Sequence, residues 1–119
     1  MELFKNLIYE HKKGMRDLAL YTCKKEKIKY FEKILYLTKT NYKIMHLPPN
    51  KYNIFFGKKE CLNILENFSS ENLNKLTPQE DFILGIMLGY SRNEQYARFL
   101  KKINHTVTFC KNTEKISSK

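Results

Sequence analysis

The sequence contains little glycine, proline or cysteine: it has four Gly, three Pro and three Cys among 119 residues. So few Gly and Pro exclude collagen-like and low-complexity chains, and an apolar content of 42% excludes a fully disordered chain. The longest apolar-rich segment, Phe82–Tyr90, is too short to cross a bilayer. The length is that of a single domain that folds on its own.

The cysteines predict neither a metal site nor a disulfide framework. Cys23, Cys61 and Cys110 are far apart and form no CxxC pair. The N-terminus has no basic stretch followed by a long apolar run, so we see no signal peptide. We therefore expect a cytoplasmic protein with free thiols and without a metal or another cofactor.

The N-terminal half predicts two hairpins, each followed by a helix. Residues 3–10 and 17–22 are rich in β-compatible residues and flank a polar turn with Gly14, which favours a first hairpin. Apolar spacing then changes to a helical period between residues 24 and 37. The prolines after Leu47 predict a turn between strands 42–47 and 51–56, and a second helix covers 58–68.

The C-terminal half predicts two helices and a tail. Thr77-Pro78-Gln79-Glu80 combines an N-cap, a proline at the first helical position and a capping-box glutamate, and Gly85 would permit close approach of a neighbour. A second capping box at 91–94 opens a helix whose expected buried stripe is Tyr96, Phe99, Leu100 and Ile103. We expect one domain over residues 1–103 and a loose polar tail over 104–119.

The order ββα-ββα-αα favours an α+β fold. We expect a two-layer sandwich, in which about four helices cover one face of a four-stranded, mainly antiparallel sheet. The apolar residues on both faces of the first expected strand, Leu3–Tyr9, are compatible with a homodimer formed through the other face of the sheet.

No catalytic constellation stands out. The three histidines, His11, His46 and His105, are scattered, and the capping box accounts for Glu80. An enzyme would need a pocket that the sequence does not reveal, lined by Tyr9, Glu10, His46 and Cys61. We therefore predict no catalytic residue and favour a binding protein.

One connection has the form of an anion site. A strand runs through Gly57 into a helix that begins near Lys58 and Lys59, and free N–H groups at a helix start can hold an anion. The longer spacing of a phosphate-binding loop is absent. A simple, solvated connection explains the same residues.

The formal net charge of +10 is concentrated in the first half, where residues 1–60 hold 14 basic and six acidic groups. This excess favours an acidic partner of some kind. The partner-binding residues that we predict are Lys12, Lys13, Arg16, Lys24 and Lys25. A solvated lysine-rich surface and an RNA- or DNA-binding module are alternatives, and the aromatics available to stack on bases are Tyr42, Tyr52, Phe55 and Phe56.

Two stretches together carry a family resemblance: Ile8–Thr22 (IYEHKKGMRDLALYT) and Leu76–Tyr90 (LTPQEDFILGIMLGY). The chain resembles a small family of bacterial proteins of about this length that is classed as a domain of unknown function. The likeness spans about residues 3–103, and its middle part is matched only by element order. It implies a two-layer α+β fold and no established activity. The family's association with gene neighbourhoods that contain flavodoxin, an acidic electron carrier, implies an acidic redox protein as partner.

Overall fold

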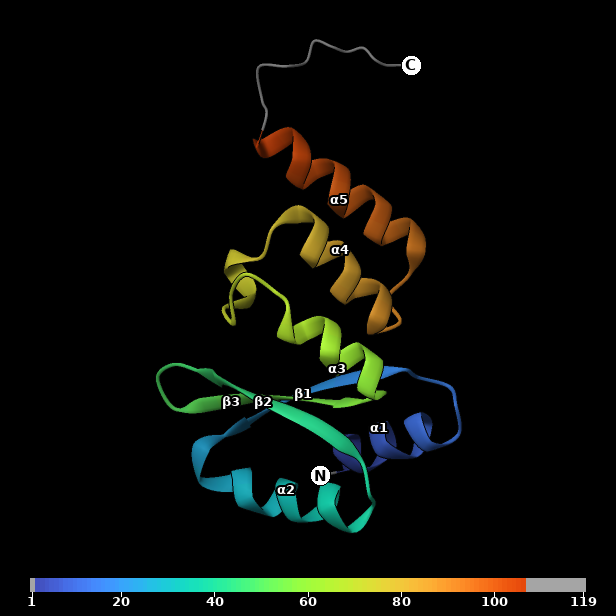
Figure 1. Cartoon of the computed structure of the whole chain (residues 1–119), viewed down its shortest axis with the longest axis vertical. Coiled ribbons are helices and arrows are strands. Elements are labelled where there is room, and N and C mark those ends of the chain that lie inside the picture. Colours follow the sequence, from blue (N-terminus) through green and yellow to red (C-terminus); the bar gives the residue numbers. More distant parts are fainter. Residues whose placement is uncertain (1, 107–119) are drawn as a thin grey trace.

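The computed structural model describes residues 2–106, which form five α-helices and a three-stranded antiparallel sheet (Figure 1). In chain order the elements are α1 (Glu2–Lys12), β1 (Leu18–Lys24), the 3-10 turn η1 (Lys25–Lys27), α2 (Ile28–Leu37), β2 (Asn41–Leu47), β3 (Lys51–Gly57), α3 (Lys59–Glu66), the 3-10 turn η2 (Leu73–Lys75), α4 (Pro78–Met87) and α5 (Arg92–Thr106). The fold class is thus α+β, as expected, with three strands where the sequence predicted four.

The strand β3 lies in the middle of the sheet, in the order β1-β3-β2. Its residues Asn53–Gly57 are all buried, and Phe55 and Phe56 are wholly inaccessible to solvent. Because successive side chains of a strand point to opposite faces, Phe56 enters one core and Phe55 enters the other. The sheet is therefore covered on both faces.

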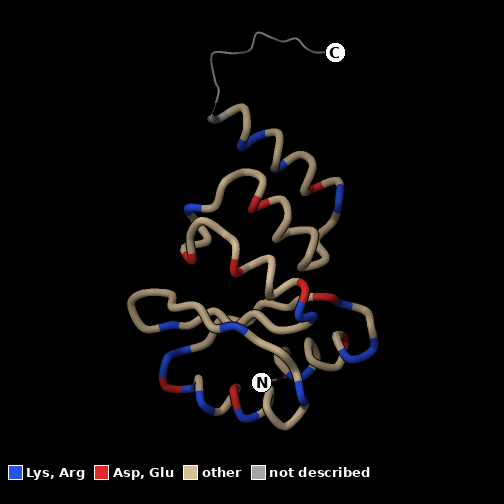
Figure 2. The backbone as a smooth tube through the Cα atoms, viewed as in Figure 1, with Lys and Arg blue, Asp and Glu red and all other residues tan. Residues whose placement is uncertain are grey.

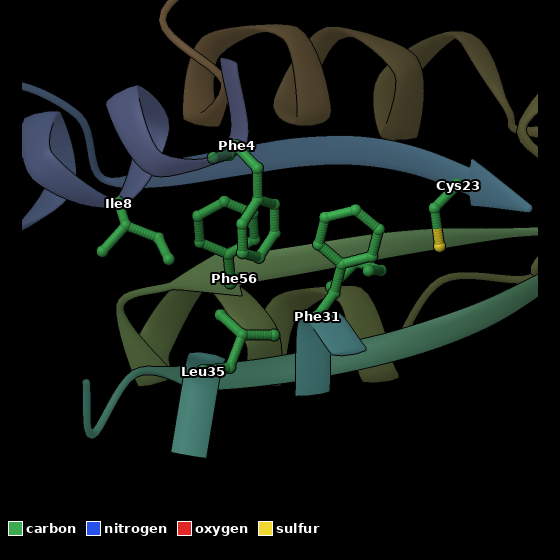
Figure 3. Packing of buried hydrophobic residues seen from close by; sticks show 8 residues of the cluster. Phe4, Ile8, Cys23, Phe31, Leu35 and Phe56 are labelled. Carbon is green, nitrogen blue, oxygen red and sulfur yellow. The ribbon is translucent and has the colours of Figure 1, made fainter. Parts of the chain in front are cut away.

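The first core lies between the sheet and helices α1 and α2. Phe4 of α1, Phe31 of α2 and Phe56 of β3 meet there, and the ring of Phe4 lies 4.7 Å from that of Phe31 and 5.1 Å from that of Phe56 (Figure 3). Tilted ring contacts at this distance add to the stabilisation that burial of the rings provides. This aromatic cluster attaches both N-terminal helices to one face of the sheet.

The second core lies on the opposite face, where α3 packs on the sheet and α4, which lies beyond α3, also contributes buried residues (Figure 1). Phe55 of β3 and Met45 of β2 meet Leu65 of α3 and Leu84 of α4 there. The prediction of helices on one face was therefore wrong: the layers are α1 and α2, the sheet, and then α3 and α4, with α5 packed on α4.

The largest correction concerns residues 3–10, which form helix α1 and no strand. Phe4 and Ile8 are buried one helical turn apart, whereas Leu3 and Tyr9 are each 59% exposed. The apolar residues that we expected on both faces of a strand instead follow the i, i+3, i+4 spacing of a helix. With α1 in place of a strand, the first hairpin does not exist and the sheet has three strands.

The second hairpin and the start of α4 are confirmed. Leu47 pairs with Lys51 across the β2–β3 turn, and strands β2 and β3 begin and end within one residue of the predicted positions. At α4, the Thr77 hydroxyl accepts the Glu80 N–H, and the Glu80 carboxylate accepts the Thr77 N–H in return. Local hydrogen-bonding chemistry sets both features, so the sequence alone predicts them.

The last helix departs from the prediction. α5 continues to Thr106, three residues past the predicted domain boundary, and the rest of the expected tail lies outside the described residues. Of the predicted buried stripe, Phe99 and Ile103 are half-buried, but Tyr96 is 48% and Leu100 is 59% exposed. The residue buried against α4 is instead Gln95, beside Gly85, where a side chain would overlap the Gln95 carboxamide.

The turn after β3 requires glycine. Gly57 has a φ of 147°, and a Cβ at this position would overlap the Asp17 carbonyl oxygen. We expect Gly57→Ala to lower the free energy of unfolding by about 2–4 kcal/mol, because it adds backbone strain and overpacking. Gly14 is the control: its φ is 79° but no atom lies within 4 Å of the position that a Cβ would take, so Gly14→Ala should cost about 1 kcal/mol. If both variants lose the same free energy of unfolding in urea, the close approach of Gly57 to the Asp17 carbonyl oxygen is contradicted.

Hydrogen bonds lower the pKa of Glu80, because its carboxylate accepts the Thr77 N–H and then the N–H and hydroxyl of Ser69. A lowered folded-state pKa means that this carboxylate stabilises the fold above about pH 4.3, and that the contribution is lost as the pH falls through the folded value. We expect an NMR titration midpoint below about 4.3, and Ser69→Ala should raise it. Ser70→Ala, which removes a hydroxyl bound to Asn72, should leave the Glu80 midpoint unchanged.

Candidate functional site

Arg16, one of the predicted partner-binding residues, connects two layers of the fold. Its Nε donates to Glu10 Oε1 at 3.0 Å, and its Nη1 donates to the Leu88 carbonyl at 3.0 Å. Leu88 is the C-cap of α4, so Arg16 satisfies a carbonyl at that helix end and is neutralised by Glu10. These contacts give Arg16 a structural role.

Lys12 is the last residue of α1 and Lys13 follows it. Both are close to the C-terminal end of α2. Lys12 Nζ donates to the carbonyl of Lys39 at 3.2 Å, and the Lys13 ammonium lies 5.6 Å from the centre of the Tyr9 ring. Neither ammonium has a carboxylate within salt-bridge distance in the described part of the chain. The fold thus places Lys12 beside Lys39, 27 positions away in the sequence.

Lys24 and Lys25 lie at the other end of α2, where β1 passes into η1. Between these two ends, the solvent face of α2 carries two more lysines. Lys29 and Lys33 are exposed and one turn apart, and helical spacing places Tyr36 and Tyr30 on the same face. Tyr36 is 80% and Tyr30 is 45% exposed. We call the following residues the basic strip: Lys12, Lys24, Lys25, Lys27, Lys29, Lys33 and Lys39.

Between residues 24 and 39 the basic strip has six lysines against two acidic residues, Glu26 and Glu32, so its positive charge is only partly balanced. Among residues 2–106, none of its seven lysines has a carboxylate within 4.0 Å. Glu32 of α2 accepts the Tyr42 hydroxyl at 3.1 Å instead, and the basic residues gather in the α1–α2 layer (Figure 2). The first turn of α2 holds no acidic residue and has no side-chain cap, although a helix start favours negative charge. The strip is thus a site where an external anionic group would relieve repulsion.

The proposed anion site at Gly57, Lys58 and Lys59 is already close to an anion of the chain itself. Lys58 Nζ lies 3.2 Å from Asp17 Oδ1, and the Lys58 N–H donates to the Asp17 carbonyl at 2.9 Å. The hydrogen bond to Asp17 raises the pKa of Lys58. Lys59 is exposed and lines a cleft of about 240 Å³ with Lys43, which pairs with Glu66. Binding of an external anion there stays a prediction.

The side chains of the enzyme alternative do not converge. Glu10 is paired with Arg16, and Tyr9 is exposed on the same helix, in the layer opposite to α3. Cys61 on α3 is buried in the second core, where burial raises the pKa of its thiol and so disfavours the thiolate. His46 lies near the β2–β3 turn, with its ring 5.6 Å from that of Tyr52. These four residues build no shared pocket.

The sheet aromatics are not available as a stacking platform. Phe55 and Phe56 are completely buried because helices cover both faces of the sheet. Tyr52 packs against the first core, and Tyr42, at 37% exposure, is bound to Glu32. Sequence analysis missed Tyr30 and Tyr36, which are the exposed aromatics beside the lysines. Their spacing with Lys29 and Lys33 was the signal that could have found them.

A cleft of about 310 Å³ lies between α4, α5 and the sheet. Gln95 lines it with a side chain that is 95% buried and makes no hydrogen bond within the described residues. Asp81 and Arg98 close one wall with a paired contact of 2.6 and 3.0 Å. An unpaired buried amide costs about 1–3 kcal/mol, which a bound water would recover.

Neither a metal-binding cluster nor a membrane-spanning helix is found in the part of the chain that the structure describes. Residues 2–106 contain no group of three or more His, Cys, Asp or Glu side chains placed to hold a metal ion. In the same range, no helix has the length and apolar content needed to cross a membrane.

The role of Arg16 leads to a test on stability. Arg16→Gln should lower the free energy of unfolding by about 1–2 kcal/mol, because it removes a charged hydrogen bond to Glu10 and uncaps the Leu88 carbonyl. Lys12→Gln, an exposed change on the same layer, should shift it by less than about 0.5 kcal/mol. Denaturant unfolding of the two variants measures both values. An unaffected Arg16→Gln variant would show that the tie between α1 and α4 is dispensable.

Comparison with known proteins adds a family and no activity. No curated protein matches the chain. A family described as "Protein of unknown function (DUF2023)" matches residues 2–102, which include every element from α1 to α4 and most of α5. Because the match covers most of the 119 residues, the chain belongs to the DUF2023 family of proteins of unknown function.

Proposed function

We propose that this protein is a non-enzymatic interaction module that docks an acidic protein along the basic strip. The observation that carries the proposal is the set of seven strip lysines, none of which has a carboxylate within 4.0 Å in the described residues. Like charges held together without compensation repel one another, and an acidic partner would remove that repulsion. Of the predicted partner-binding residues, Lys12, Lys24 and Lys25 belong to this surface. Arg16 lies outside the strip and bonds to Glu10 of α1, the helix that carries Lys12.

The composition of the strip favours a protein partner. Tyr30 and Tyr36 stand between the lysines on the outer face of α2, and tyrosine is enriched in protein interfaces. Lysines around such a centre increase the association rate more than the final affinity. We therefore expect a small and transient interface, with binding that weakens steeply as salt is added. Such an interface suits a carrier that must be released again.

The family resemblance suggests flavodoxin, an acidic electron carrier, as the first partner to test. In a titration of the ¹⁵N-labelled chain at low ionic strength, flavodoxin should shift the amide signals of α2, η1 and the end of α1. The double variant Lys29→Glu, Lys33→Glu should weaken binding by about 10- to 100-fold, because two attractions become repulsions. The variant should stay folded, since Glu is accepted at exposed helix positions.

The matched control reverses the same number of charges elsewhere. Lys75 and Lys101 are exposed and lie in η2 and α5, away from the strip, so Lys75→Glu, Lys101→Glu should change the affinity by less than about threefold through the net charge alone. If both double variants weaken binding equally, only the net charge matters and the strip is not the site. If the protein retards a single-stranded oligonucleotide in a gel at low salt and does not bind flavodoxin, the partner is a nucleic acid and the proposal is wrong.

A further inference from the structure

The cleft between α4, α5 and the sheet holds a buried polar side chain without a partner. Gln95 is only 5% exposed, and its carboxamide makes no hydrogen bond within residues 2–106. That group has one acceptor oxygen and two donor hydrogens, and buried polar groups of this kind are nearly always paired. A molecule that enters the cleft of about 310 Å³ would supply the missing hydrogen bonds.

Gly85 makes the carboxamide part of the cleft wall. A Cβ at Gly85 would overlap the side-chain oxygen and carbon of Gln95, so the amide group lies directly against the backbone of α4. Gly85 is inside this helix and does not have a positive φ, so glycine provides close approach there and not a left-handed conformation. Both residues line the cleft, and the amide is therefore at its surface.

The rest of the wall is mostly apolar. Tyr90 is 53% exposed and offers a ring face for stacking, and the apolar lining residues are Leu20, Leu73, Leu84 and Leu88. An apolar cleft with a few polar groups is the usual form of a small-molecule site. Such sites measure about 300–1,000 Å³, so this cleft suits one small ring system and not an extended cofactor.

The charged groups of the cleft neutralise each other. Among its lining residues only Asp81 and Arg98 carry a charge. Nε and Nη2 of Arg98 donate to the two carboxylate oxygens of Asp81, at 2.6 and 3.0 Å. The cleft thus presents no net charge, which favours a ligand that enters through an uncharged, hydrogen-bonding end.

The Gln95 carboxamide matches a planar ring that has a donor and an acceptor side by side. An amide presents its own donor and acceptor in one plane, and the edge of a nucleobase is complementary to it. Two hydrogen bonds from a Gln side chain to N6 and N7 of adenine are the established pairing of this kind. The faces of a base are suited to contact with apolar and aromatic side chains such as those that line the cleft.

We propose that this cleft binds the purine base of a free nucleoside or mononucleotide, with adenine held at its N6 and N7 edge by Gln95. A nucleic-acid strand is not the expected ligand, because strand binding needs a cationic track beside the bases. The basic strip lies in the α1–α2 layer, on the other face of the sheet (Figures 1 and 2). The base site is therefore separate from the surface that we assign to an acidic partner.

Titration of the ¹⁵N-labelled full chain with adenosine tests the site. The side-chain NH₂ signals of Gln95 should shift together with the backbone amides of Gly85 and Tyr90, with a Kd of about 0.01–1 mM for a ligand of this size. N6,N6-dimethyladenosine lacks the N6 donor, so it should bind at least about tenfold more weakly to the unmodified protein. Adenosine 5′-monophosphate should shift the same signals.

Gln95→Leu should weaken adenosine binding at least about tenfold, because it removes both hydrogen bonds. The variant should stay folded, since leucine has a similar size and the amide that it replaces is unpaired. The matched control is Gln79→Leu, the same change at an exposed position of α4 outside the cleft, which should bind as the unmodified chain does.

Three results would overturn the proposal. The first is that the Gln95 signals do not move at about 10 mM adenosine, which leaves only water for the cleft. The second is equal binding of adenosine and its N6-dimethyl analogue, or of the unmodified chain and Gln95→Leu. The third is binding of adenosine 5′-monophosphate without any binding of adenosine, because the phosphate and not the base would then be recognised.

Discussion

The burial of β3 on both faces is the constraint on which the rest of the structure depends. Ile54, Phe55 and Phe56 are consecutive and all have zero exposure, yet they serve two different cores. Each such side chain contributes about 1.5–3 kcal/mol through burial, so the strand alone accounts for a sizeable part of the hydrophobic stabilisation. A slip of one residue in its pairing would exchange the two cores and leave neither filled. The two helical layers keep their positions only because this register holds.

The sequence predicted those elements whose signals are local. The Thr77–Glu80 capping box needs only its own four residues, and the β2–β3 hairpin follows from its prolines and from alternation, so both are found in the structure. Residues 3–10 were misassigned because a short apolar run satisfies both a strand and a helix pattern, and the partner that decides between them, Phe31, comes much later in the chain. The start of α5 was predicted correctly, but its buried side was not, because Gly85 of α4 leaves room for Gln95 and not for the apolar stripe.

The candidate site shows the same division between local and distant information. The excess of lysine was visible in the composition, and Lys12, Lys24 and Lys25 do lie at the two ends of α2. Counting charges along the chain could not show that Arg16 pairs with Glu10 and reaches Leu88, which is 72 positions away. It also could not show that Lys39 adjoins Lys12, or that two tyrosines stand exposed among the lysines. Charge excess was thus predictable, and its arrangement on a surface was not.

The attachment of α5 has a consequence for the motions of the molecule. α5 packs mainly on α4, and the buried helical residues of the second core come from α3 and α4, so the last helix lies one layer further from the sheet than any other. Local opening is easiest where few buried contacts must break. Amide protons of α5 should therefore exchange with solvent through a detachment that leaves the strands closed, and those of β3 should exchange only when the whole domain unfolds.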